Sequence, residues 1–563
     1  MSPHHSAHGL PWAGVALACT VGIVGMGFDP HAAPPLLASI PARMPEHVPE
    51  HVLVHLRPLS CEAGEKSLYD HGFTLDLPSC RAELQPRLTA LRALGIHPVR
   101  ILKLTRALAI EATPEQLAQL KRLPWVERLT PDAPLTLPPE PLQLVPSPSK
   151  GPLEANVEAN ERWNLAMVRA PDLWSLGIKG AGAVVASLDS GVDRAHVALS
   201  AGYRGAAGDW LDLFGEYAQP TDEDGHGTQS ISLAVGREVN GQPVGVAPAA
   251  QWIAVRMFQN GASSLSLAHQ ALDWAIDPDG NPATSDQPDV VLASWWLEGS
   301  TNTCLTEFSA DFASLEAAGI PVVFAGGNTG PNSSTSVAPA TDPDAWSVGA
   351  VDASGTVASF SARGPSACGG SLYPQVSAPG VQVEAADLTF GVFSSATILA
   401  TGTSFAAPAV AGAVALLRGQ EPLATPSDLQ IAILSTALDI GPAGDDMQTG
   451  TGLLDVFSAL QGLAVTPNLP PEANADTGEV HRGKLSILTV LANDSDPEGQ
   501  LDVKSVRLEA LPRQGVAAVA ADGTIQYTAS RTARGQDTFS YTVADSLGQR
   551  SPVASVVIKI LLK

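Results

Sequence analysis

Three short motifs in this 563-residue chain carry side chains that could act together as an acid, a base and a nucleophile. Asp189 stands in Ser-Leu-Asp-Ser-Gly, His226 in Asp-Gly-His-Gly-Thr, and Ser404 in Gly-Thr-Ser-Phe-Ala. A serine hydroxyl is a poor nucleophile until an imidazole takes its proton, and a carboxylate fixes the tautomer of that imidazole. Acyl transfer also needs hydrogen-bond donors for the developing oxyanion, which the Asn328 amide and the Ser404 backbone N–H could supply.

Each motif taken alone has an ordinary structural explanation. Asp-Ser-Gly after a strand is usually a turn, His-Gly can begin a helix, and Gly-Thr-Ser before a helix is usually an N-cap. The interpretation changes because all four residues fall in one region, at strand ends or helix starts. In an open α/β sheet these positions converge on a single crevice.

Buried strands alternating with helices must position these side chains. Apolar runs without alternation occupy residues 183–191, 251–258, 289–296, 321–328 and 345–352. Such runs are typical of strands covered by helices on both faces. We therefore predict an α/β domain over residues 156–463, built as three layers around a central, mostly parallel sheet.

Proline-rich stretches separate this region from its neighbours, so residues 29–50, 138–155 and 464–474 are predicted linkers. Residues 51–137 predict a small α+β domain, in which Thr113 caps a helix ending before Pro124 and an edge strand follows. Residues 475–563 alternate with period two between Asn, Asp and Gly turns, which predicts a β-sandwich.

The first 28 residues predict a signal peptide or a membrane anchor. Residues 10–28 carry no charge and are nearly all apolar, although histidines replace the usual Lys or Arg before them. Ala18-Cys19 loosely resembles a lipoprotein cleavage site. A buried helix of a cytosolic domain is the alternative. We expect the protein to be secreted or attached to the cell envelope of a bacterium.

Composition excludes some classes of protein. With 32 Lys+Arg against 57 Asp+Glu the formal charge is −25, and no basic cluster is present, so we expect no nucleic-acid partner. No Cys/His group has zinc spacing. Export would permit disulfides, and the simplest pairing joins Cys61 with Cys80 and Cys304 with Cys368, although four cysteines allow three connectivities.

The motifs, taken in their order, resemble those of the subtilisin-like serine proteases, the subtilase family (peptidase S8). Residues 245–248 (GVAP), 359–365 (SFSARGP) and 376–380 (VSAPG) extend the match, which covers about residues 156–463 and is most similar to the bacillopeptidase F-like branch. The resemblance implies Asp189, His226 and Ser404 as catalytic triad and Asn328 as oxyanion donor. It implies peptide-bond hydrolysis through an acyl-enzyme, with no cofactor required for the chemistry.

The resemblance also assigns the small N-terminal domain. Residues 51–137 are similar to the family's inhibitory propeptide (inhibitor I9-like), with an unrelated α+β adaptor as the alternative. The propeptide would act as an intramolecular inhibitor, and cleavage by the enzyme itself is expected between about Asp132 and Asn160. The implied partners are protein and peptide substrates, and we expect a monomer.

Two departures from the family pattern concern the substrate. Gln229 replaces a second histidine, with little expected effect. Ser294-Trp295-Trp296 stands where subtilases typically carry Ser, an apolar residue and Gly, on an edge that pairs with substrate. Trp296 would add bulk at the rim and narrow side-chain selection. The expected walls of an apolar-leaning primary pocket are Ala325, Gly326, Gly327 and the stretch from Val337 to Ala340.

Metal sites are harder to assign. Subtilases often bind structural calcium, but no loop has EF-hand spacing, so the catalytic domain offers no assigned site. The C-terminal domain resembles a bacterial cadherin-like or Ig-like repeat. Asp494, Asp496 and Asp502 are weak calcium candidates there, and an Asx-turn loop is the simpler explanation. We expect this domain to grip a cell-surface or extracellular ligand or to stabilise the enzyme.

Two other classes of function compete with a secreted endopeptidase. One is a catalytically silent binding protein with a subtilase fold. The other is an adhesin in which the C-terminal domain dominates and proteolysis is incidental.

Overall fold

The computed structural model describes residues 50–59, 78–137, 145–146, 162–282, 284–463, 470–496, 501–520, 522–545 and 549–561. The chain divides into two units, Met1–Val48 and Pro49–Lys563, and the first unit lies outside the described residues together with the predicted targeting segment. Among the described helices, none is long and apolar enough to cross a membrane.

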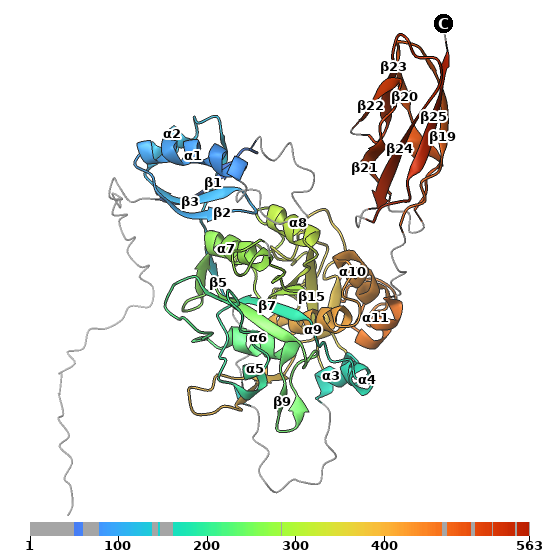
Figure 1. Ribbon diagram of the computed structural model, residues 1–563. Helices are drawn as coiled ribbons and strands as arrows, with labels where there is room; N and C mark the ends of the chain where they lie inside the picture. Colours follow the sequence, from blue (N-terminus) through green and yellow to red (C-terminus); the bar gives the residue numbers. More distant parts are fainter. Residues whose placement is uncertain are drawn as a thin grey trace, which may run out of the picture. The chain divides into compact units, whose positions relative to one another are not determined.

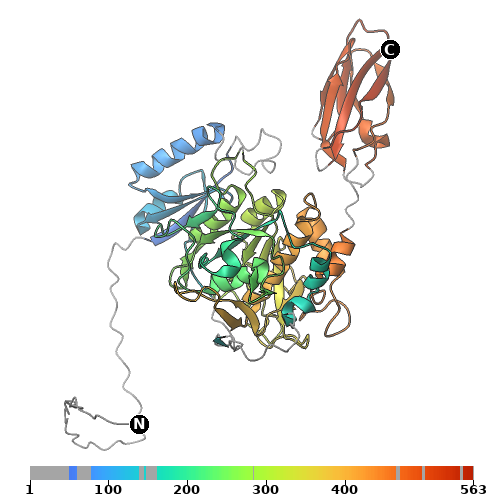
Figure 2. The ribbon, with the colours of Figure 1, turned by 60° about the horizontal axis from the view of Figure 1, so that its bottom comes forward.

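The N-terminal part is an α+β sandwich, as predicted. Its antiparallel sheet has the order β2-β3-β1-β4, and helix α1 lies along one face of the sheet (Figure 2). Thr113 forms the predicted capping box with Gln116 at the start of α2, and β4 is the predicted edge strand. The elements are β1 (Glu50–Leu56), α1 (Pro78–Ala93), β2 (Pro98–Leu102), β3 (Ala107–Ala112), α2 (Pro114–Leu120) and β4 (Val126–Pro131).

The central domain contains the predicted parallel sheet, with the order β16-β15-β14-β13-β7-β11-β8. Every neighbouring pair in it is parallel. Strands β7 and β15 of this sheet are labelled in Figure 1. The strands are β7 (Val184–Asp189), β8 (Trp210–Asp212), β11 (Gln251–Arg256), β13 (Val290–Ala293), β14 (Val322–Ala325), β15 (Ala345–Val351) and β16 (Val376–Pro379).

Helices cover both faces of this sheet. Alternate residues of each strand enter opposite cores, so Val185 packs in the core that contains α6 and α9, while Ala186 packs in the core that contains α7 and α8. This explains why the strands read as continuous apolar runs. The helices are α3 (Trp163–Met167), α4 (Ala170–Ser175), α5 (Val197–Ser200), α6 (His226–Val235), α7 (Leu265–Ile276), α8 (Ser309–Ala317), α9 (Ala407–Arg418), α10 (Pro426–Ser435) and α11 (Val456–Gly462).

Short strands extend the central domain. β5 pairs antiparallel with β12, β6 pairs with β18, β17 pairs with β18, and β9 pairs with β10. Their bounds, with those of one 3₁₀ turn, are β5 (Pro134–Thr136), β6 (Val145–Pro146), β9 (Glu238–Val239), β10 (Gln242–Pro243), β12 (Ala262–Ser264), β17 (Val383–Ala386), β18 (Thr397–Ala400) and η3 (Thr403–Phe405).

The C-terminal domain is the predicted β-sandwich, with sheets of order β19-β25-β24-β21 and β20-β23-β22. Tyr527 stacks on Phe539 between the sheets, with ring centroids 5.8 Å apart. The elements are β19 (Asp476–His481), β20 (Leu485–Leu488), η4 (Val490–Asn493), β21 (Leu501–Ala510), β22 (Gly515–Val519), β23 (Ile525–Ala529), β24 (Gly535–Asp545) and β25 (Ala554–Leu561).

Candidate active site

A carboxylate and an imidazole meet at the carboxyl end of the central strand. Asp189 is the last residue of β7 and His226 the first of α6, and both side chains are buried. His226 Nδ1 lies 2.8 Å from Asp189 Oδ1 and 3.0 Å from Oδ2. A carboxylate at Nδ1 directs the acceptor lone pair of the neutral ring to Nε2, which is the form a general base needs.

Glycine allows the two elements to approach this closely. A Cβ at Gly227 would lie 2.2 Å from the carbonyl oxygen of Gly191 and 3.1 Å from Asp189 Cβ. Ser190 Oγ instead accepts the Gly227 N–H at 2.9 Å, which ties the first turn of α6 to the residue after the strand. The His-Gly pair of the motif is therefore required by packing as well as by chemistry.

Ser404 lies in η3, immediately before α9, and its side chain is fully buried. The ring of the next residue, Phe405, lies 5.6 Å from the His226 ring between centroids. Ser404 Oγ makes no hydrogen bond to any described residue. A buried hydroxyl left without a structural partner is unusual, and such groups often belong to functional sites.

The Asn328 amide is oriented by the residue that precedes Ser404. Asn328 follows β14, and its Oδ1 accepts hydrogen bonds from both the backbone N–H and the hydroxyl of Thr403, each at 2.9 Å. The Thr403 hydroxyl also accepts the Gly327 N–H at 3.0 Å. With the acceptor side held, the donor Nδ2 is buried and makes no hydrogen bond within the described structure. A fixed amide with an available N–H is what an oxyanion site requires.

Some of the predicted pocket residues pack together, whereas others have side chains that lie elsewhere in the domain. Trp296, Ala325 and Val337 form one small cluster of buried apolar side chains, with Trp296 only 6% exposed. The tryptophan therefore lies against two of the expected pocket walls, rather than only at their rim. A Cβ at Gly327 would come within 2.6 Å of Val337 Cγ2, so this wall is packed tightly.

Other predicted subsite residues turn their side chains elsewhere. Trp295 packs in the α7–α8 core and donates its indole N–H to the Leu188 carbonyl at 3.0 Å. Ser294 Oγ lies 2.6 Å from Ser230 Oγ, and Ala340 is buried in the same core as Trp295. A substrate role for Ser294 and Trp295 would accordingly use their backbone.

An extended segment from the N-terminal part lies along a strand edge of the central domain, which the sequence did not predict. Residues Pro134, Leu135 and Thr136 of β5 pair with Ser264, Ser263 and Ala262 of β12. The Leu137 N–H extends this ladder to the Gly261 carbonyl at 2.8 Å. Leu135 is 2% exposed and joins the core of the central domain.

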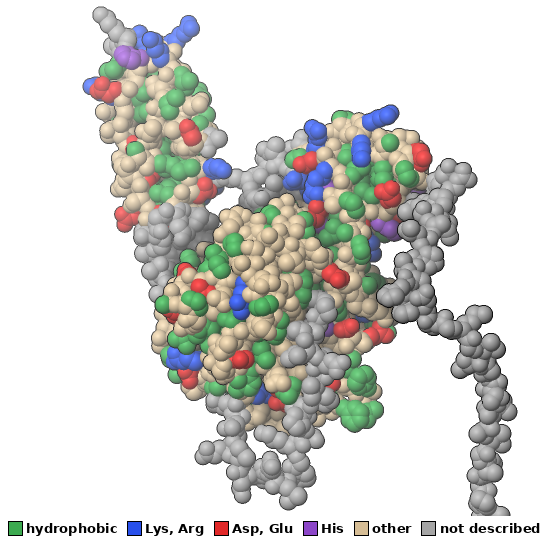
Figure 3. Space-filling model, turned by 180° about the vertical axis from the view of Figure 1, so that it is seen from behind, with side chains coloured by type: hydrophobic (Ala, Val, Ile, Leu, Met, Phe, Trp, Pro, Cys, Tyr) green, Lys and Arg blue, Asp and Glu red, His purple; other side chains and the backbone are tan. Residues whose placement is uncertain are grey.

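The same N-terminal part is anchored by charge. Asp132 accepts the Ser266 N–H at 2.8 Å and the Ser266 hydroxyl at 2.7 Å, at the N-terminus of α7. Arg128 forms an ion pair with Glu307 at 2.6 Å. In the face drawn in Figure 3, blue Lys and Arg side chains gather on the N-terminal part and at the far tip of the C-terminal sandwich, while the central domain shows only scattered charges.

Buried titratable side chains also lie at the contact between the N-terminal part and the central domain. His55 of β1 contacts Glu307 at 2.9 Å, and His269 of α7 contacts Asp311 at 2.9 Å. Burial alone would lower the pKa of His269, but the Asp311 charge and hydrogen bond overcome it and raise that pKa to about 9. Burial raises the pKa of Asp273 to about 7, even though that carboxylate accepts backbone N–H groups from Lys103 and Leu104.

The predicted bridge between Cys304 and Cys368 is confirmed, with the two Cα atoms 4.8 Å apart. Cys80 is also disulfide-bonded, and Cys61, its predicted partner, lies outside the described residues. The pairing of Cys61 with Cys80 stays a prediction. The Cys304–Cys368 disulfide is consistent with an oxidising compartment.

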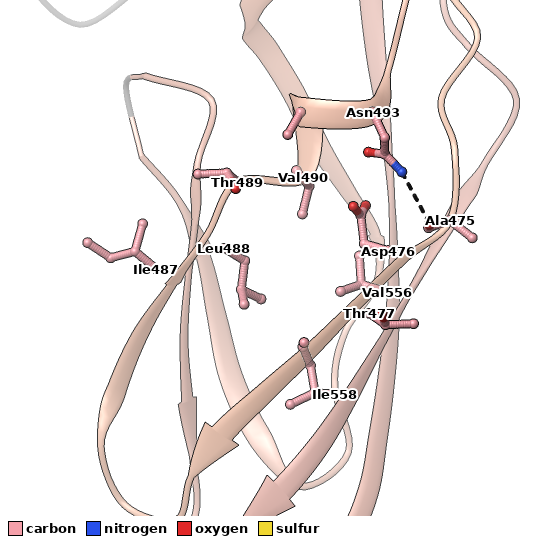
Figure 4. A pocket seen from close by; sticks show the side chains of 12 residues that line it. Ala475, Asp476, Thr477, Ile487, Leu488, Thr489, Val490, Asn493, Val556 and Ile558 are labelled. Atoms are coloured by element: carbon pink, nitrogen blue, oxygen red, sulfur yellow. Dashed lines mark hydrogen bonds between the residues drawn. The ribbon is translucent and has the colours of Figure 1, made fainter.

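The weak calcium candidates of the C-terminal domain stay predictions. Asp494 accepts the Asn474 N–H and the Tyr541 hydroxyl, both at 2.7 Å, and Asp502 accepts the Lys504 N–H. These are the bonds of turn-forming residues. Near them lies a cavity of about 450 Å³, into which Asp476 points among apolar side chains such as Ile558 (Figure 4).

A different acidic group was missed in the sequence. Within the described part of the chain, Asp277, Asp279 and Asp286 place carboxylate oxygens within 4.8 Å of one another. The sequence feature that could have indicated this group is the run Asp-Pro-Asp-Gly, which directly follows a helical pattern. This run does not have the spacing of an EF-hand loop. Such a group could hold a metal ion.

Comparison with known proteins identifies the family. A profile of the subtilase family matches residues 180–452, and a bacterial Ig domain profile matches residues 468–559. The chain belongs to the subtilase family of serine peptidases, as predicted, and carries a C-terminal bacterial Ig domain. Chemistry in this family needs no cofactor.

Three relatives from Bacillus illustrate the extent of the similarity. The chain is 31% identical to bacillopeptidase F of Bacillus subtilis (strain 168) over 452 residues, which is 72% of this chain but only 30% of that protein. It is 32% identical to subtilisin E of the same organism over 304 residues, covering 53% of this chain and 71% of that protein. The subtilisin of Bacillus pumilus is 31% identical over 304 residues, and the match covers 98% of it.

Proposed function

We propose that the protein is a serine endopeptidase in which Ser404, His226 and Asp189 hydrolyse peptide bonds through an acyl-enzyme. The observation that carries this proposal is the 2.8 Å contact of Asp189 with His226, beside a buried serine hydroxyl that no described residue binds. Ser404 Oγ attacks the carbonyl carbon of the peptide while His226 Nε2 takes its proton. Asp189 stabilises the resulting imidazolium.

The oxygen of the attacked carbonyl becomes negative in this step. The Asn328 Nδ2 and the Ser404 backbone N–H at the start of a helix are the donors that would stabilise it. His226 then returns its proton to the leaving amine, and the peptide C–N bond breaks. Water attacks the acyl-enzyme by the same route and releases Ser404.

Covalent labelling tests this mechanism. A fluorophosphonate reacts only with a serine hydroxyl that is activated, so the parent chain should be labelled and Ser404→Ala should not. Thr403→Ser is a matched control, because it retains the hydroxyl that holds Asn328 and should remain labelled. Absence of labelling in a folded, processed parent would favour the catalytically silent binding protein.

We further infer that the N-terminal part is an inhibitory propeptide of an exported zymogen. Its support is the antiparallel pairing of β5 with β12, which precedes α7 and forms a strand edge of the central domain. An extended peptide that adds to a strand edge is a common mode of peptide recognition. The Cys304–Cys368 disulfide and the apolar residues 10–28 support export.

Sequencing the N-terminus of the protein recovered from the culture medium tests both inferences. Maturation predicts a start between about residues 133 and 160 in the parent and a start before residue 51 in Ser404→Ala. Identical N-termini in both chains would show that another protease cuts, and an intracellular product would contradict export. For the Ig domain we propose a surface-binding role, which deletion after Thr466 would test by loss of attachment to cells.

A further inference from the structure

The loop that joins α7 to β13 contains a buried carboxylate, Asp277, whose oxygens are not in hydrogen-bond geometry with any described group. Asp277 follows the last residue of α7 and is 7% exposed. Neither of its oxygens has a hydrogen-bond partner. The nearby Asn281 N–H donates to Asp279 Oδ1, at 2.8 Å. An unpaired buried carboxylate is costly, so its presence calls for a counter-charge.

Two further carboxylates face the same point. Oxygens of Asp277, Asp279 and Asp286 lie within 4.8 Å of one another. Asp286 Oδ2 accepts the Asp279 N–H at 2.8 Å, while its Oδ1 is buried and also unpartnered. The charge of Lys103 acts on Asp277 and that of Arg204 on Asp286, so three carboxylates share two nearby positive charges. A bound cation would stabilise the group further.

Hydrogen bonds from neighbouring residues and close packing hold the loop in this shape. Thr284 Oγ1 donates to Asp279, and Arg204 donates to the Asp286 carbonyl at 2.8 Å. A Cβ at Gly208 would lie 2.3 Å from the Pro278 carbonyl oxygen, so the loop packs closely on a neighbouring turn. Trp274 donates its indole N–H to the Gly208 carbonyl and fixes that turn from the helix side.

We propose that Asp277, Asp279 and Asp286 bind one calcium ion, which ties the end of α7 to the segment leading into β13. The donors are all oxygens, which a hard cation prefers, and calcium accepts irregular oxygen coordination, whereas magnesium demands near-ideal octahedral geometry. The position beyond the C-terminal carbonyls of α7, at the negative end of the helix dipole, also favours a cation.

A calcium ion at the end of α7 would lie in the connection between two segments of the central domain. α7 begins directly after β12, and β13 leads into Ser294 and Trp296. Calcium at the junction would therefore fix the spacing between two segments that the sequence places beside the substrate. The Ca²⁺ would act by holding the fold and would not contact the reacting atoms.

Thermal melting and calcium counting of the full chain in a Ser404→Ala background test this inference without using activity. After treatment with EDTA, calcium at about 100 times its dissociation constant should raise the melting temperature of the catalytic domain by about 4 °C. Asp277→Asn should bind one calcium ion fewer per chain and lose this rise. Asp445→Asn, which removes an exposed acid elsewhere in the same domain, should retain both.

The EDTA arm separates a lost ligand from a damaged fold. Without calcium, Asp277→Asn should melt no lower than its background, because it neutralises a buried, repelled carboxylate. Asp286→Asn should reproduce the loss of one ion if Asp277→Asn fails to fold. Unchanged calcium stoichiometry in both variants would overturn the site. An equal temperature rise with magnesium at the same concentration would overturn the choice of ion.

Discussion

Trp296 should determine which residue the enzyme accepts before the scissile bond. Its indole packs on Ala325 and Val337, two of the residues expected to line the primary pocket, and the residue is 6% exposed. Subtilases typically have glycine here, and Trp296→Gly would empty the space between these walls. A substrate phenylalanine or leucine that fills this space would be buried, and burial of such a side chain stabilises the bound state by about 1.5–3 kcal/mol. At about 1.4 kcal/mol per tenfold, kcat/KM for such substrates should rise about 10- to 150-fold.

Paired peptides that differ only in that residue, Ala against Phe, measure the effect. Rates are normalised to the sites labelled by fluorophosphonate, so that any loss of folded protein is removed from kcat/KM. Removing a buried tryptophan costs about 3–5 kcal/mol of stability, so both variants are assayed well below their melting temperatures. Trp174→Ala, a half-buried tryptophan that bonds to the Val246 carbonyl, is the matched control.

The ratio of the two substrates decides the outcome. We expect the Phe/Ala ratio to rise in Trp296→Gly, with the rate for Ala nearly unchanged, and to stay at the parent value in Trp174→Ala. A Phe/Ala ratio in Trp296→Gly equal to that of the parent would refute the reasoning. It would mean that the indole does not occupy the space into which the substrate side chain must go.

Three other predictions concern the site and the propeptide contact. Asn328→Ala should lower kcat by about 10²–10³, the range recorded for an oxyanion donor of subtilisin itself, with KM nearly unchanged in steady-state assays. Leu135→Asp should shorten the lag before activity appears in freshly folded zymogen, because it removes a buried anchor of β5; a lag equal to that of the parent would contradict inhibition through this strand. His269 has a folded pKa of about 9 against about 6.5 when unfolded, so its stabilisation is complete below pH about 6.5 and is lost as pH rises through about 9. Urea unfolding of Ser404→Ala should therefore lose roughly 3 kcal/mol across that window, and His269→Gln should flatten the profile.

The layered fold was readable from the sequence because its strands are buried on both faces. Runs such as residues 184–189 are apolar throughout, and only a parallel sheet between helices makes that pattern stable. Local signals also sufficed for the capping box at Thr113, whose hydroxyl and Gln116 satisfy each other within one turn. The Cys304–Cys368 pairing followed from assigning both cysteines to one domain.

Contacts between distant segments were not readable in this way. Pro134, Leu135 and Thr136 carry no strand pattern, and they form β5 only because β12 offers a free edge. The sequence placed Trp296 at a pocket rim, but its packing on Val337 depends on how two segments far apart in the sequence meet. The orphaned oxygens of Asp277 are likewise a property of the folded loop, because spacing alone cannot tell a paired carboxylate from an unpaired one.

The edge strand β12 links inhibition to substrate binding in the proposed zymogen. Its backbone groups at Ala262 and Ser264 are already paired with β5, and the Gly261 carbonyl accepts the Leu137 N–H. A substrate strand that uses this edge must first break those bonds, so propeptide and substrate compete for the same donors and acceptors. Asp132 adds a second anchor at the start of α7, which means that cutting the chain after Leu137 would leave the strand held until both contacts are lost. Release of the propeptide, rather than cleavage alone, would then limit the onset of activity.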